Sequence, residues 1–78
     1  MLEKFETYQL AVNLYRGCQK VTAPNYLKDQ LLRASLSVVL NLAEGSAKPT
    51  PKERRRFYSI ALASTREVQA VFDVMNEQ

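Results

Sequence analysis

The sequence predicts an all-α protein, an up-and-down antiparallel helical bundle. Three segments show helical hydrophobic periodicity, no segment alternates with the two-residue period of a strand, and the segments are separated by Pro24 and by Gly45 with Pro49 and Pro51. Short connections between consecutive helices favour antiparallel neighbours. We therefore expect a single domain over residues 1–78, with helices at about 3–21, 26–44 and 51–76.

The first predicted helix, residues 3–21, is apolar around most of its circumference. At about 100° per residue, its polar side chains form one narrow stripe. The remaining apolar arc is about 240° wide, against about 100° for a typical surface helix. We expect such a helix to need neighbours on more than one side. Cys18 falls within the arc and is expected to be a small core residue.

The second predicted helix, residues 26–44, carries two adjacent apolar stripes and is also expected to be buried on two sides. Asn25 is its predicted N-cap, and Gly45 is predicted to end it in a left-handed conformation. Polar side chains from this helix and the third form a polar motif: Gln30, Arg33, Asn41, Glu44, Gly45, Ser64 and Glu67. An interhelical network that fixes helix register is the favoured interpretation, and a ligand or catalytic acid site is the alternative.

The third predicted helix, residues 51–76, has a clear start. Thr50-Pro51-Lys52-Glu53 fits a capping box, with Thr50 as N-cap, Pro51 in the first turn and Glu53 reaching back. The rest of the segment is an ordinary amphipathic helix. The aromatic residues could suggest base stacking, but their helical spacing favours core packing, with Tyr26 and Tyr58 as candidate exposed exceptions; the set is Phe5, Tyr8, Tyr15, Phe57 and Tyr58.

Positive charge is concentrated where the third helix begins. Residues 48–56 hold five basic side chains and one acidic one, a net charge of +4, whereas the whole chain has +3. A basic loop that leads into a helix N-terminus can bind phosphate through side-chain charge and free backbone N–H groups. A solvated surface that keeps an apolar chain soluble is the competing, and more common, origin of such a run. The candidate nucleic-acid-binding residues are Lys48, Lys52, Arg54, Arg55, Arg56 and Arg66.

Several functional classes are disfavoured by composition. The chain has no His and one Cys, which excludes Ser-His-Asp and Cys-His catalytic sets, His-ligated zinc and an internal disulfide. We expect no enzyme activity, no catalytic residues, no metal and no cofactor. Apolar runs are too short for a membrane span, and the first residues do not form a signal peptide. A lone thiol without a targeting signal favours the cytoplasm.

Two sequence motifs resemble one family. Leu27-Lys28-Asp29-Gln30-Leu31-Leu32-Arg33-Ala34-Ser35 with Asn41-Leu42-Ala43-Glu44-Gly45, and then residues 57–67, are similar to the four-helix-bundle proteins related to the 23S rRNA intervening-sequence proteins. Ala63 stands where that family usually has Gly. The resemblance implies a bacterial four-helix bundle that assembles as a homopentamer. By this resemblance the sequence corresponds to the first three helices. The three interpretations of the missing fourth helix are a truncated product, a sequence that is part of a longer one, and packing supplied by a partner chain.

The apolar surplus of the first two helices predicts a homo-oligomer, independently of the resemblance. The leading functional hypothesis is a non-enzymatic, self-assembling bundle that binds RNA or DNA through the basic start of the third helix. The alternative is a purely structural or protein-interaction scaffold. A small-molecule-binding bundle ranks third, because no set of polar pocket residues stands out.

Overall fold

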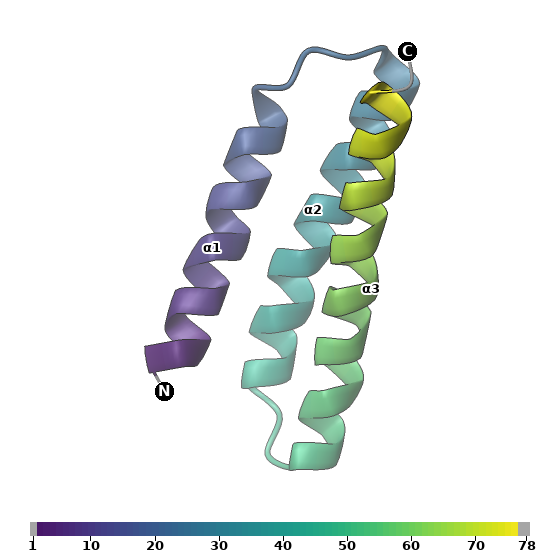
Figure 1. The fold of residues 1–78 in the computed structure, drawn as a ribbon. Helices are drawn as coiled ribbons and strands as arrows, with labels where there is room; N and C mark the ends of the chain where they lie inside the picture. Colours follow the sequence, from purple (N-terminus) through teal and green to yellow (C-terminus); the bar gives the residue numbers. More distant parts are fainter. Residues whose placement is uncertain (1, 77–78) are drawn as a thin grey trace.

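The computed structural model describes residues 2–76. It contains three helices, α1 (Leu2–Gln19), α2 (Asn25–Ser46) and α3 (Pro51–Asn76), and no strand within the described residues. The helices run in alternating directions along a molecule of 43 × 19 × 16 Å (Figure 1). The predicted all-α antiparallel arrangement is therefore confirmed. Helix α1 ends two residues earlier than expected because the amides of Lys20 and Val21 bond carbonyls only three residues back.

Helix α2 is the centre of the arrangement, since it packs against both other helices. Figure 1 shows α1 and α3 on either side of it. Among the described residues, no Cα atom of α1 lies within 8 Å of a Cα atom of α3. The three helices therefore form an open layer in which the backbone of α1 lies close to α2 and not to α3.

The main core lies at the end of the molecule that holds the α1–α2 connection and the last turns of α3, which we call the closed end. Six buried residues form this core: Cys18, Leu27, Leu31, Ala34, Val68 and Val71. Leu31 is fully buried and Cys18 is 1% exposed, which confirms the expectation for the thiol. Lys28 of α2 holds the end of α1 in place. Its Nζ donates to the carbonyl oxygen of Gln19 (2.8 Å), the last residue of α1, and to the carbonyl oxygen of Val21 just beyond it.

The opposite end holds the first turns of α1 and the α2–α3 turn, and we call it the open end. Here Phe5 is 64% exposed and Leu10 is 68% exposed. The expectation that Phe5 packs in the core is wrong within this chain, whereas the expectation that α1 needs neighbours on more than one side stays a prediction. The physical reason is that only the backbone of α2 comes close to α1, and at the open end no described α3 residue covers Phe5 or Leu10.

Two expected helix-end signals are also wrong. Asn25 is not an N-cap: it is the first residue of α2, and the carbonyl of Pro24 accepts the N–H groups of Leu27 and Lys28 without any side-chain cap. Gly45 is helical, and among the described residues no glycine has a positive φ. It is buried, and a Cβ atom on it would lie 2.7 Å from Cε1 of Tyr58. This glycine lets α2 and α3 approach closely.

Candidate nucleic-acid interface and interhelical polar seam

The first turn of α3 is capped by side-chain hydrogen bonds. The Glu53 N–H donates to Thr50 Oγ1 (3.2 Å), and the Thr50 hydroxyl donates to Glu53 Oε1 (3.0 Å). The Glu53 carboxylate thus accepts from the hydroxyl of Thr50, whereas the capping box predicts that it accepts from the backbone N–H. Pro51 has no N–H, and the N–H of Arg54 bonds the carbonyl of Thr50 (3.0 Å). Few backbone N–H groups of this turn are therefore free to bind a phosphate, whereas the sequence predicts that free N–H groups contribute to phosphate binding.

Two of the six candidate basic residues hold the α2–α3 turn together. Arg54 donates from Nε to the carbonyl of Lys48 (2.9 Å) and from a terminal nitrogen to the carbonyl of Pro49 (3.2 Å). Lys48 forms an ion pair with Glu44 (3.2 Å), and its Nζ lies 5.1 Å from the centre of the Phe57 ring. These two cations therefore contribute to the turn's own structure and are less available to a ligand.

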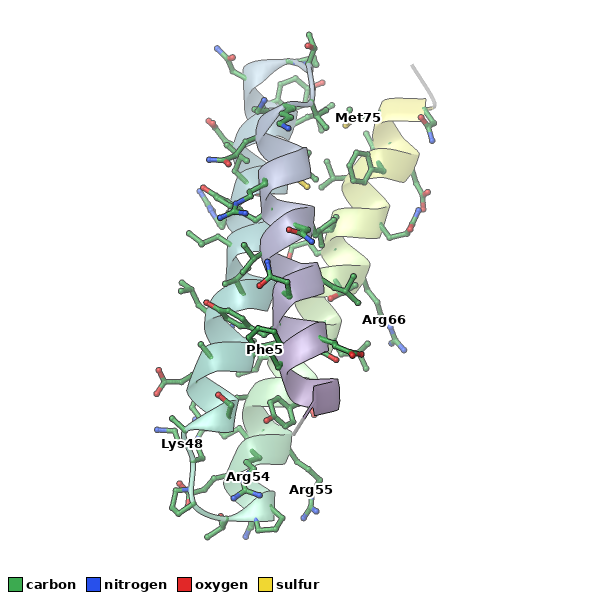
Figure 2. The ribbon with its side chains drawn as sticks, turned by 90° about the vertical axis from the view of Figure 1, so that its left-hand side faces the viewer. Phe5, Lys48, Arg54, Arg55, Arg66 and Met75 are labelled. Carbon is green, nitrogen blue, oxygen red and sulfur yellow. The ribbon has the colours of Figure 1, made fainter. Side chains whose placement is uncertain are left out.

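The other cations of the run are open to solvent. Lys52, Arg55 and Arg56 are exposed, and within the described residues their side chains form no hydrogen bond or ion pair. Their three- and four-residue spacing places them on adjacent parts of one helix surface. Arg66 is also exposed and lies 11 residues after Arg55, about 16 Å along the axis. Figure 2 shows Arg55 and Arg66 projecting from the same side of α3, with Lys48 on the other side of the turn.

A row of hydrogen bonds lies along the α2–α3 contact, and we call it the polar seam; two of these bonds cross from α2 to α3. Ser37 and Ser64 share a hydrogen bond of 2.8 Å between their hydroxyl oxygens. Asn41 Nδ2 donates to the Ser37 carbonyl (2.9 Å) and hydroxyl (3.1 Å). At the closed end, Gln30 Nε2 donates to Glu67 Oε2 (3.2 Å).

The polar seam brings four of the predicted motif residues together and omits three. Arg33 and Glu44 are exposed and lie outside it, and Gly45 serves the close contact with Tyr58. Ser37 belongs to the seam but is not among the predicted motif residues. Its position four residues before Asn41, on the same polar side of α2, is the signal that identifies it. The seam's hydroxyl and amide groups satisfy one another, which is the arrangement of a register-fixing network.

Two kinds of feature are absent from the part of the chain that the structure describes. It contains no group of three or more His, Cys, Asp or Glu side chains that could hold a metal ion. Its helices also include none with the length and apolar character to cross a membrane.

Among the comparisons with known proteins, only the one with family models gives a match. No significant match is found among the curated proteins or among the solved structures. A family model, described as 23S rRNA-intervening sequence protein, matches residues 3–78, which is nearly the whole chain. The match covers all three helices, the α2–α3 turn and the polar seam. The chain therefore belongs to the 23S rRNA-intervening sequence protein family.

Proposed function

We propose that this protein is a non-enzymatic, self-assembling helical bundle that binds RNA or DNA through the basic start of α3. The observation that carries the proposal is the group of exposed cations Lys52, Arg55 and Arg56, which have no acidic partner among the described residues. Arg66 extends the same helix surface. Phosphate groups are the natural partners of clustered, unpaired guanidinium and ammonium groups.

The turn that precedes these cations supports the proposal. Arg54 bonds two carbonyls of the turn, and Thr50 caps the helix, so the first turn of α3 is fixed before any ligand arrives. A fixed presentation lowers the conformational entropy that binding costs. The family's description also names 23S rRNA, which supports RNA as the first probe.

The test compares two triple variants that lose the same charge. Lys52→Gln/Arg55→Gln/Arg56→Gln removes the proposed contacts and leaves Arg54 in the turn. Arg16→Gln/Lys20→Gln/Arg33→Gln removes three other exposed cations. Binding to a fluorescent 20-base-pair RNA duplex and to the matching DNA duplex is measured by anisotropy over a range of salt concentrations. We expect the first variant to reduce the slope of log affinity against log salt by about 2 to 3.

The control triple variant should lower affinity much less and keep most of the salt slope. Equal losses in both triple variants would show that only net charge matters, and the assigned surface would then be wrong. Unchanged affinity in the first variant would exclude these three cations as the binding surface.

A second candidate function, an oligomeric scaffold without nucleic acid, is favoured by a different observation. The open end exposes large apolar side chains, including Phe5, Leu10 and Leu62, and exposed apolar groups of this kind mark protein-interaction surfaces. Absorbance of the purified protein distinguishes the two functions. Copurifying nucleic acid raises the 260/280 nm ratio, and a high-salt wash lowers it again, whereas a scaffold alone shows neither effect.

A further inference from the structure

One exposed face of α3 combines cationic side chains with short ones. Six residues of this face lie within an arc of about 100° when each residue turns the helix by about 100°, and all six are exposed. None of them lines the two cavities between α1 and α3. We call this face the basic stripe, and it consists of Lys52, Arg55, Arg56, Ser59, Ala63 and Arg66. The basic stripe therefore belongs to the outer surface of the bundle.

The cations of the basic stripe form two groups. Residues 52–56 hold three of them, and Arg66 lies 11 residues after Arg55, about 16 Å further along the axis. Figure 2 shows Arg55 and Arg66 projecting from the same side of the helix. Between the two groups, the stripe contains only the short side chains of Ser59 and Ala63. The stripe thus has long cationic side chains at both ends and a low centre.

This shape fits two phosphate backbones with a groove between them. The major groove of B-form DNA is about 12 Å wide, and the minor groove of A-form RNA is also wide, and is shallow. Phosphates stand on the rims of these grooves, so two groups of cations about 16 Å apart along the helix can reach both rims. A single strand offers one backbone only, so it does not use both groups in this way.

The acidic side chains that follow Arg66 bind other partners. Glu67 accepts a hydrogen bond from Gln30 of α2 (3.2 Å), and Asp73 accepts one from Gln69 (3.0 Å). Within the described residues, no carboxylate pairs with any cation of the basic stripe. Asp73 lies seven residues after Arg66 on the same helix face, so it ends the positive stretch. The positive surface therefore extends over residues 52–66.

Aromatic side chains are absent from the basic stripe. Sites for single-stranded nucleic acid combine positive charge with aromatic side chains on which the bases stack. The exposed aromatic residues among those described are Phe5 and Tyr8 of α1 and Tyr26 of α2, and none belongs to α3. Tyr26 lies at the closed end, whereas the stripe begins at the open end (Figure 1). The stripe therefore offers contacts to phosphates without a platform for unpaired bases.

We propose that the basic stripe binds double-stranded nucleic acid across one groove. The cations at residues 52–56 contact the phosphates of one strand, Arg66 contacts those of the other, and Ser59 and Ala63 face the groove between them. The ligand class is thus duplex RNA or duplex DNA, recognised through its two phosphate backbones. This inference rests on the proposed function, and it narrows the ligand from any RNA or DNA to a duplex.

The main experiment compares ligands with equal numbers of nucleotides. Anisotropy measures the binding of the whole chain to a 20-base-pair RNA duplex, to the matching DNA duplex and to a 40-nucleotide oligouridine, which has no base pairs. All three are measured at the same salt concentrations. We expect one duplex or both to bind at least about tenfold more tightly than oligouridine, because only a duplex engages both groups of cations.

Two variants with matched controls test the placement of the duplex. Ala63→Trp puts a bulky aromatic ring into the centre of the stripe, so it should weaken duplex binding about fivefold or more and leave oligouridine binding unchanged or tighter. Ala43→Trp makes the same change at an exposed alanine of α2 and should leave duplex binding unchanged. Arg66→Gln should lower the salt slope for the duplex by about 0.9, whereas Arg33→Gln, at an exposed arginine of α2, should alter it much less. Circular dichroism verifies that every variant is folded.

Three outcomes overturn the inference: oligouridine that binds as tightly as both duplexes, duplex affinity that Ala63→Trp leaves unchanged, or a salt slope that Arg66→Gln and Arg33→Gln change equally. The first outcome leaves the proposed function standing, because the chain still binds nucleic acid. Absence of binding to all three ligands overturns the proposed function and this inference together. A duplex preference that depends on Ala63 and Arg66 supports both.

Discussion

The two ends of the molecule differ in how many helices surround the apolar face of α2. At the closed end, Cys18 from α1 and Val68 and Val71 from α3 meet Leu31 of α2 in one core. At the open end, the corresponding space between α1 and α3 is a groove, and Leu10 and Leu62 on its banks are more than half exposed. The apolar residues of the sequence are similar at the two ends, so the difference lies in how many of them find a partner within the chain.

The contrast shows that an apolar pattern predicts that a helix packs against other helices, but does not predict whether those helices belong to the same chain. Lys28 binds the carbonyls at the end of α1 and keeps that end against α2. At the other end, no Cα atom of α1 lies within 8 Å of a Cα atom of α3 among the described residues. The closed end therefore stabilises the fold, whereas the open end leaves apolar side chains exposed. Three sets of substitutions test that division, beginning with the largest expected effect.

Leu31→Ala should be the most damaging of the three, because this side chain is fully buried at the closed end. Loss of its methyl groups and the cavity left behind should lower the free energy of unfolding by about 2–5 kcal/mol. The matched variant Leu40→Ala, in the other half of α2 and 57% exposed, should change it by at most about 0.5 kcal/mol. Urea unfolding monitored by circular dichroism measures both, and similar losses would contradict the division.

Gly45→Ala tests whether the close contact between α2 and α3 at the open end contributes to stability. A Cβ atom there would lie 2.7 Å and 2.9 Å from two Tyr58 ring atoms and 3.1 Å from Cβ of Phe57. The ring and the helix must shift, which we expect to lower the free energy of unfolding by about 1–2 kcal/mol, despite the better helix propensity of Ala. Thermal unfolding measures the change. A more stable variant would show that the close contact is not needed.

Gly17→Ala should have the smallest effect and the opposite sign. This glycine lies in α1, and a Cβ atom on it would meet open space, with no neighbouring atom within 4 Å. Greater helix propensity should raise the free energy of unfolding by about 0.5–1 kcal/mol. Thermal unfolding, measured beside Gly45→Ala, separates a glycine that serves packing from one that does not. A loss of stability would place a neighbour against this side of α1.

The helices could be predicted closely because their signals are local. Thr50, Pro51 and Glu53 mark the start of α3, and it begins at Pro51 as expected. Cys18 and Leu31 could be assigned to the interior because periodicity identifies a helix face. The errors arose where a local rule competes with tertiary contact. Gly45 resembles a helix terminator in sequence, yet the Tyr58 ring against its backbone gives it a packing role within α2.

The candidate site was predicted only in outline, for the same reason. The run of residues 48–56 identified the basic surface, but charge alone could not separate Lys48 and Arg54, which hold the turn, from Lys52, Arg55 and Arg56, which face solvent. The polar seam shows the same limit. Gln30, Ser37 and Asn41 share one helix face, but only the structure shows that Ser64 of α3 lies 2.8 Å from Ser37 and that Arg33 and Glu44 stay outside the seam.

The sequence by itself determined the class of fold, the number and approximate limits of the helices, the family and the position of the positive charge. These features depend on periodicity, caps and composition, which act over a few neighbouring residues. Only the tertiary structure decided that the backbone of α1 lies close to α2 and not to α3, and which basic side chains bond the α2–α3 turn. It also decided that the buried hydroxyl of Tyr58 has no hydrogen-bond partner. Those features depend on the relative placement of whole helices, which is set by contacts between residues far apart in the chain.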